Sequence, residues 1–98
     1  MQTYAILRRI GWRSTEDHLE FVELCSRLAD EKMPDRVRWL RSYALAEEDG
    51  SIGSVCIYEA TDAEALWEHG ARTDFPIDEI FPVPATVVTT SDPEPVAG

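Results

Sequence analysis

The order in which hydrophobic periodicities follow one another constrains the fold of this chain more than any other feature. The alternation typical of strands occupies residues 3–10, 37–45, 54–60 and 81–90. The spacing typical of amphipathic helices occupies residues 15–32 and about 62–73. This pattern predicts the order β-α-β-β-α-β, which is typical of ferredoxin-like α+β proteins. We therefore expect a four-stranded antiparallel sheet with two helices on one face.

Local signals place the ends of these elements. Ser14 is suited to cap the first helix, and Pro34 ends it because the residue before a proline avoids the helical region. The second helix begins at a capping box in residues 61–64. Between the second and third strands, residues 47–53 hold two glycines and predict a hairpin turn. We expect a short turn of helix at residues 77–80.

The length of the chain fits one domain. Its 98 residues fall within the range in which a single hydrophobic core forms. We expect residues 1–90 to form one ferredoxin-like domain, with Pro82 and Pro84 confining the start of the last strand to an edge or an irregular lead-in. Residues 91–98 contain two prolines and no large apolar side chain, which predicts a flexible tail.

Apolar side chains occur on both faces of the second and third strands. Strict alternation places one set on one face (Trp39, Tyr43, Ile57) and another set on the opposite face (Leu40, Cys56, Tyr58). Two helices cover only one face, and the sequence does not decide which. An apolar face left open is typical of an interface. We predict a homodimer that packs through this open face into a barrel-like α+β assembly; the alternative is a loop or the C-terminal segment folded over it.

Charge and composition exclude several classes of partner. Nineteen acidic residues face nine basic ones, and the net charge of -10 opposes binding to nucleic acid. No apolar run approaches the ~20 residues of a membrane-spanning helix. The N-terminal segment lacks the pattern of a signal peptide, so we expect a cytoplasmic protein. In that reducing compartment Cys25 and Cys56 are expected to be free, buried thiols.

His69 and Glu68 are the candidate metal ligands. Imidazole and carboxylate groups without an accessible thiolate suit nickel, zinc, copper or cobalt. His69 lies at the border of the apolar stripe of the second helix, and Glu68 points about 100° away from it. A metal site at His69 therefore needs ligands from other segments or from a second subunit. The alternative is a histidine at the solvent edge of the helix.

Four other residues are candidate catalytic groups for a cofactor-free enzyme: His18, Tyr43, Tyr58 and Glu59. His18 lies in the first turn of the first helix, where it either acts as an acid or base near a pocket or packs at the edge of the core. Glu59 lies in an otherwise apolar strand, where a carboxylate is costly unless it has a partner. It is a candidate general base, or it pairs across the strands with Arg38 or Arg41.

Several blocks of sequence together resemble a known family. They are Val-Arg-Trp-Leu-Arg-Ser-Tyr at 37–43, Cys-Ile-Tyr-Glu-Ala at 56–60, Asp-Ala-Glu-Ala at 62–65 before Glu68 and His69, and Phe75-Pro76 with Ile80. Over residues 3–90 the chain resembles a family of small bacterial proteins, catalogued as a domain of unknown function, that includes a nickel-binding protein. The resemblance implies a ferredoxin-like fold, a homodimer and, in that member, nickel binding, but no known reaction. Of the histidines, only His69 occupies a matching position.

Three hypotheses for function follow. The first is a small homodimeric cytoplasmic protein that binds a nickel-like transition metal through imidazole and carboxylate groups. The second is a cofactor-free enzyme of the cyclase, isomerase or monooxygenase type, acting on a small apolar metabolite in a pocket between sheet and helices. The third is an interaction module whose dimer is its whole purpose.

Overall fold

The predicted order of elements is confirmed by the computed structural model, which describes residues 1–73 and 77–94. The strands are β1 (Gln2–Trp12), β2 (Val37–Ala46), β3 (Ile52–Ala60) and β4 (Glu79–Pro82). The helices are α1 (Thr15–Lys32) and α2 (Ala63–Thr73). Neither helix is long and apolar enough to cross a membrane, and the described ranges hold no other helix.

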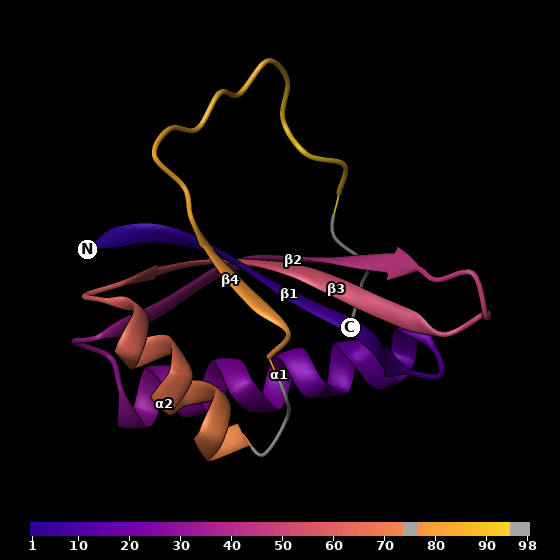
Figure 1. Cartoon of the computed structure of the whole chain (residues 1–98), viewed down its shortest axis with the longest axis horizontal. Coiled ribbons are helices and arrows are strands. Elements are labelled where there is room, and N and C mark those ends of the chain that lie inside the picture. Colours follow the sequence, from indigo (N-terminus) through magenta and orange to yellow (C-terminus); the bar gives the residue numbers. More distant parts are fainter. Residues whose placement is uncertain (74–76, 95–98) are drawn as a thin grey trace.

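Within the described residues the four strands form one antiparallel sheet in the order β2-β3-β1-β4. β1 and β3 lie at its centre, where Tyr4 is opposite Tyr58 and Arg8 is opposite Ser54. Both helices lie on the same side of this sheet (Figure 1). The molecule is therefore an α+β fold with one sheet face covered by helices and the other face free of them.

The caps of the two helices come from polar side chains. Ser14 caps α1 as predicted, and its hydroxyl accepts a hydrogen bond of 3.2 Å from the backbone N–H of Asp17. The capping box predicted Thr61 as the N-cap of α2. The helix instead begins at Ala63, one residue later than that box implies, because Asp62 is the cap. Its carboxylate accepts a hydrogen bond of 2.8 Å from the backbone N–H of Ala65, the usual geometry of an aspartate N-cap.

The fourth strand is shorter than predicted and begins earlier. We predicted a helical turn at 77–80 and a strand over 81–90, whereas β4 ends at Pro82. Pro82 and Pro84 lack the N–H groups that a longer ladder would need, which confines β4 to the sheet edge beside β1. Residues 83–94, which we name the C-terminal arm, then leave the sheet and arch above it (Figure 1).

A bulge at Leu40 in β2 changes which residues share a face. Trp39 pairs with Tyr58 and Arg41 pairs with Ile57, so the register shifts between Trp39 and Arg41. We predicted that Trp39 and Tyr58 would lie on opposite faces. Instead their rings stack on the helix side, with centroids 4.8 Å apart. The prediction was wrong because strict alternation holds only where a strand has no extra residue.

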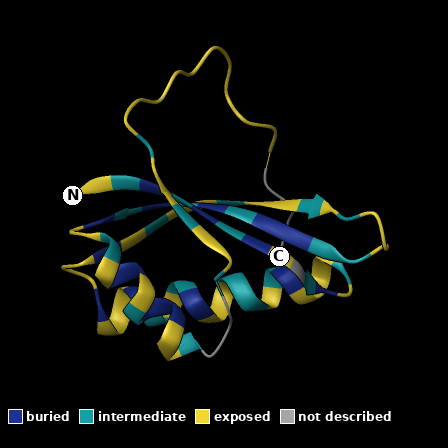
Figure 2. Ribbon diagram, in the orientation of Figure 1, coloured by how far each residue is buried: buried dark blue, intermediate teal, exposed yellow. Residues whose placement is uncertain are grey.

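The core fills the layer between the helices and the sheet, and Figure 2 shows buried residues on the facing sides of both. Its completely buried apolar side chains include Ile6, Val37, Cys56, Tyr58 and Leu66. Leu24 and Trp67 belong to the apolar stripes that the sequence gives α1 and α2, yet they are 62% and 49% exposed. The buried stripe of each helix is therefore narrower than its apolar stripe in the sequence.

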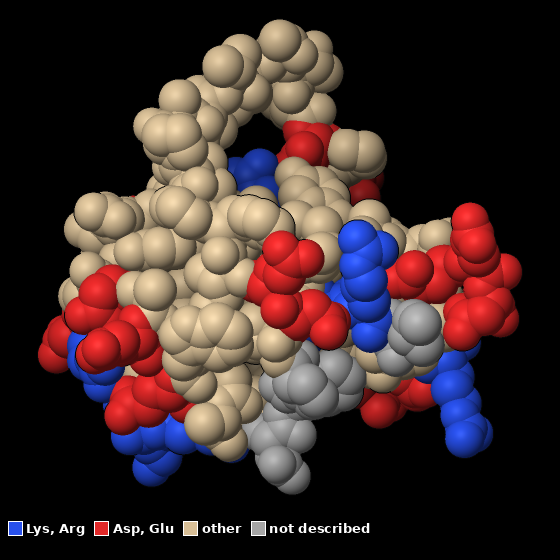
Figure 3. Space-filling model, viewed as in Figure 1, with Lys and Arg blue, Asp and Glu red and all other residues tan. Residues whose placement is uncertain are grey.

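The C-terminal arm stands over the open face of the sheet. The Asp92 carboxylate accepts hydrogen bonds from the Arg41 guanidinium at 2.7 Å and from the Tyr43 hydroxyl at 2.9 Å. Between arm and sheet lies a hollow of about 760 Å³, which Figure 3 shows as an opening beneath the arch. The arm thus reaches over this face but leaves a space beneath it. The predicted flexibility of residues 91–98 stays a prediction, and residues 95–98 lie outside the described part.

Candidate functional site

His69 lies on the inner side of α2 and is completely buried. Its Nε2 atom is 3.4 Å from the hydroxyl oxygen of Tyr58, and its Nδ1 atom has no hydrogen-bond partner among the described residues. Burial, and then the charges of Arg8 and Arg72, lower the pKa of His69 from 6.5 to about 4. The imidazole is therefore neutral at pH 7. His69 is thus a core residue, and the alternative of a histidine at the solvent edge of the helix is wrong.

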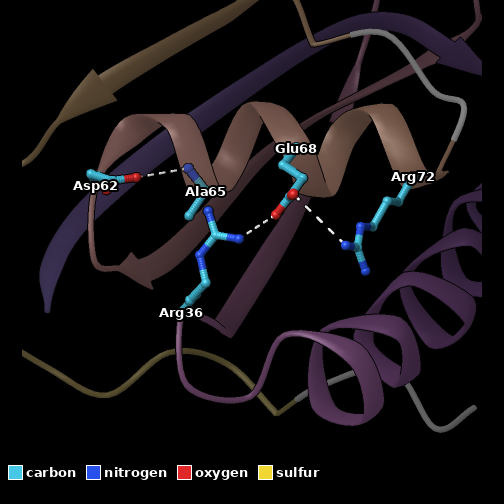
Figure 4. A network of polar contacts seen from close by, with 5 residues as sticks. All are labelled: Arg36, Asp62, Ala65, Glu68 and Arg72. Atoms are coloured by element: carbon cyan, nitrogen blue, oxygen red, sulfur yellow. Dashed lines mark hydrogen bonds and ion pairs between the residues drawn. The ribbon is translucent and has the colours of Figure 1, made fainter.

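Glu68 points away from His69, toward the outside of α2. Its carboxylate forms an ion pair of 2.5 Å with Arg36 and a second, i,i+4 contact of 3.7 Å with Arg72 (Figure 4). Consecutive residues of a helix diverge by about 100°, so these two candidate ligands do not converge on one point. Within residues 1–73 and 77–94 no three His, Cys, Asp or Glu side chains form a group that could hold a metal ion.

His18 lies at the other end of the layer between the helices and the sheet. The side chain is buried, and its Nε2 atom lies 2.9 Å from the Ser42 hydroxyl oxygen. The Trp12 ring packs edge-on against it with centroids 4.7 Å apart. Desolvation, and then the charge of Arg8, lower the pKa of His18. His18 is thus a neutral histidine packed at the edge of the core.

The other three candidate catalytic residues lie on both faces of the sheet. Tyr58 is buried beneath α2, and burial raises the pKa of its hydroxyl well above its ordinary value. Tyr43 lies on the open face and donates to Asp92. Glu59 faces away from the helices, and its carboxylate lies 3.4 Å from the Arg38 guanidinium, one of the two ion pairs considered from the sequence. The sheet therefore separates Tyr43 and Glu59 from Tyr58.

Arg8 is the polar residue of this layer that the sequence reasoning missed. It is only 1% exposed, and its Cζ atom lies 5.2 Å from the centroid of the Phe21 ring. Its Nη1 atom makes a long contact of 3.7 Å with Sγ of Cys56, while Nε and Nη2 have no hydrogen-bond partner in residues 1–73 and 77–94. One signal in the sequence could have revealed it, because Arg8 alternates with Tyr4 and Ile6 on the side of β1 that faces the core.

Aromatic rings link these polar groups into one continuous cluster. The rings belong to Trp12, His18, Phe21, Trp39, Tyr58 and His69, and neighbouring centroids lie between 4.7 and 6.3 Å apart. Such distances are typical of packed aromatic side chains. The layer between the helices and the sheet thus combines an arginine, two neutral histidines and a tyrosine with aromatic walls. We refer to it as the core site.

Comparison with known proteins identifies the family. Residues 4–83 match the model of the family described as nickel responsive protein SCO4226-like. The chain belongs to the SCO4226-like family. This confirms the resemblance seen in the sequence. No curated protein matches the chain.

A solved structure of this family shows the same fold. The crystal structure of SCO4226 from Streptomyces coelicolor A3(2) superposes with a TM-score of 0.68 and 21% sequence identity. The match covers 87% of this chain and 99% of the other. The fold described above is therefore that of an SCO4226-like protein over nearly the whole length of the relative.

The donor atoms of this SCO4226-like chain fit a nickel-class ion only in part. His69 offers a neutral imidazole with an unpartnered nitrogen, which is the form that binds metals. Glu68 is held outside by two arginines. Cys25 and Cys56 are free and buried, as predicted, and burial raises the pKa of the Cys25 thiol to about 11, so that it carries its proton at pH 7. His69 is accordingly the side chain of the core site best suited to a metal.

Proposed function

We propose that the protein is a homodimer that binds a nickel-class divalent ion, with His69 as its imidazole ligand. The observation that carries this proposal is the match of residues 4–83 to a family described as nickel responsive. The unpartnered Nδ1 atom of His69 supports it, because a buried polar atom without a partner is destabilising and a metal ion would satisfy it. Glu68 is not among the ligands of this site, because its carboxylate pairs with Arg36 and Arg72.

The remaining ligands of this site must come from outside the set described above. First-row transition ions bind imidazole together with other nitrogen, oxygen or sulfur donors, and one imidazole alone does not make a stable site. Arg8 opposes the binding, since its charge lowers the pKa of His69 and disfavours a metal cation for the same reason. Binding of the ion therefore requires further donor atoms, which a second subunit could supply. It is favoured by any change that offsets the charge of Arg8.

The open face of the sheet supports the dimer. Leu40, Tyr43 and Phe81 are 39%, 39% and 47% exposed although all three are large and apolar or aromatic. Val87 and Val88 of the C-terminal arm are 85% and 72% exposed, and the arm above the sheet carries few charges (Figure 3). Exposed apolar side chains of this kind, beside the ion pairs of Arg41 with Asp92 and of Arg38 with Glu59, are typical of a contact between two copies of a chain.

Isothermal titration with nickel chloride tests the metal. The wild-type protein is expected to bind the ion with a micromolar or tighter Kd, and His69→Gln is expected to lose at least tenfold in affinity. Glu68→Gln is the matched control, because the neighbouring carboxylate is already occupied by Arg36 and Arg72. Absence of binding at micromolar nickel, or equal affinity in wild type and His69→Gln, contradicts the proposal.

Sedimentation velocity at micromolar concentration tests the dimer. Phe81→Glu places a charge on the open face and is expected to shift the protein toward the monomer. Leu24→Glu is the control, because Leu24 is equally apolar and 62% exposed but lies on α1, away from this face. A wild-type protein that sediments as a monomer, or a dimer broken by Leu24→Glu alone, contradicts the arrangement.

A second candidate is the cofactor-free enzyme. The observation in its favour is that His18, Tyr58 and His69 lie in one layer, with both imidazoles neutral near pH 7. Tyr43 and Glu59 are not among the catalytic groups of this second candidate, since they lie on the face of the sheet away from the helices. Turnover of small apolar metabolites by metal-free protein distinguishes the two candidates, because the enzyme consumes one of them and its rate falls in His18→Gln, whereas the metal protein consumes none.

A further inference from the structure

Among residues 1–73 and 77–94, no carboxylate forms an ion pair with the buried guanidinium of Arg8. Its Nε and Nη2 atoms are shielded from solvent and have no hydrogen-bond partner. The carboxylates of Glu68, Glu59 and Asp92 pair with other arginines. A buried charge normally persists only where it is paired or hydrogen-bonded, so this group requires an explanation.

The two unpartnered atoms have a specific geometry. Nε and Nη2 lie on one edge of the planar guanidinium, and their N–H bonds run parallel. Two parallel N–H donors match the two oxygens of a carboxylate, the fork that arginine uses in bidentate recognition. The remaining nitrogen of the guanidinium, Nη1, is already directed at Sγ of Cys56. The free edge of Arg8 is therefore the edge that a carboxylate would use.

The positive potential of Arg8 extends through the core site. Its charge contributes to lowering the pKa of His18 on α1 and of His69 on α2. The rings of both histidines belong to the aromatic cluster of the core site. An anion bound at Arg8 would thus meet one full positive charge in a layer that also holds two imidazole rings.

The surroundings favour an organic anion with an apolar or aromatic body. The face of Phe21 lies over the guanidinium, and the aromatic cluster continues from it through Trp39 to Tyr58. The sheet beside Arg8 presents small side chains, with Ser54 directly opposite it in β3 and the hydroxyl of Ser42 near Cys56. A phosphate dianion would require more donors than this one fork provides.

We propose that Arg8 binds the carboxylate of a small organic acid in the layer between the helices and the sheet. This site is distinct from the metal ligand proposed above and does not depend on nickel. The two would nevertheless be linked, because an anion at Arg8 offsets the charge that opposes a cation at His69. The acid itself is defined by its chemistry, which is one carboxylate on a compact apolar or aromatic body.

Thermal unfolding and NMR of the full chain test this proposal with sodium acetate and sodium benzoate as probes. Ionic strength is held constant with sodium chloride, and sodium phosphate is the third arm. A ligand that binds only the folded state raises the Tm progressively with its concentration. We expect benzoate, and more weakly acetate, to raise the Tm above the chloride reference. The Nε–H resonance of Arg8 should shift saturably with the same probe.

Two variants and a control assign the effect to Arg8. Arg8→Lys keeps the charge and loses the fork, so benzoate affinity should fall at least tenfold, and Arg8→Met should abolish the response. Arg9→Met is the control, because Arg9 is the exposed neighbour on the opposite face of β1 and should respond as wild type. If a variant fails to fold, the Nε–H resonance of the wild-type protein still decides the question.

Three results overturn the proposal. In the first, no carboxylate raises the Tm or shifts the Arg8 resonance beyond the effect of chloride. In the second, phosphate alone does so, which contradicts the carboxylate class. In the third, Arg8→Met responds to benzoate as the wild type does. None of these measurements involves nickel, so failure of this proposal is distinguishable from failure of the metal site.

Discussion

Acid is expected to destabilise this protein through His69. Burial, followed by the charges of Arg8 and Arg72, lowers its pKa from 6.5 to about 4 in the folded protein. The folded state therefore favours the neutral imidazole, whereas the unfolded chain takes up a proton near pH 6.5. The contribution of His69 to stability is fully present above pH 6.5. It declines as the pH falls and is lost once the pH passes below about 4.

The size of this effect follows from the difference between the two pKa values. Each pKa unit corresponds to about 1.4 kcal/mol, so the shift from 6.5 to about 4 amounts to roughly 3 kcal/mol of unfolding free energy. The side chain is completely buried, so solvent screening does not reduce this figure. For a domain whose total stability is roughly 5–15 kcal/mol, that loss is large.

Urea unfolding at several pH values between 7.5 and 4 measures the effect. The wild type is compared with His69→Gln, which has a similar polar side chain that does not titrate in this range. Carboxylates contribute to acid unfolding in both proteins, so the difference between the two curves isolates His69. We expect the wild type to lose roughly 3 kcal/mol more than the variant over this interval. Equal losses in both proteins would refute the burial and charge environment assigned to His69.

The remaining predictions concern the caps, the hairpin and the arm. Asp62→Ala should lower the unfolding free energy by about 1 kcal/mol in urea titration, because it removes the α2 cap, whereas Thr61→Ala should have little effect. Gly53→Ala should destabilise by about 1–3 kcal/mol in the same assay, since the added Cβ would lie 2.8 Å from the backbone oxygen of Arg8. Asp92→Asn should change stability by less than about 1 kcal/mol, because its contacts are exposed, yet limited proteolysis should cut the C-terminal arm faster than in the wild type.

The sequence predicts the elements of this fold well because each has a clear period and each of the two helices has a polar cap. Ser14 and the glycines of the 47–53 turn mark boundaries that local chemistry determines. The same reasoning overestimated the last strand, since residues 81–90 are rich in strand formers but hold two prolines. The end of β4 at Pro82 is determined by the missing N–H donors of the prolines and not by the strand preference of the side chains.

The candidate site was less predictable because it depends on burial. Periodicity alone placed His69 at the border of the apolar stripe and Trp67 within it, whereas the packing of α2 buries His69 and exposes Trp67. The bulge at Leu40 moved Trp39 to the helix side, and no local signal in the sequence marks that extra residue. Arg8 was not among the candidate site residues, although it alternates with core residues along β1.

The crystal structure of the nickel-loaded protein, with anomalous scattering at the nickel absorption edge, tests the central claim most directly. The account predicts an anomalous peak about 2.1 Å from Nδ1 of His69, the usual distance between a first-row metal and an imidazole nitrogen. Glu68 should remain paired with Arg36 in that structure. A peak at surface carboxylates with Nδ1 of His69 unoccupied, or no ordered nickel at all, would contradict the claim.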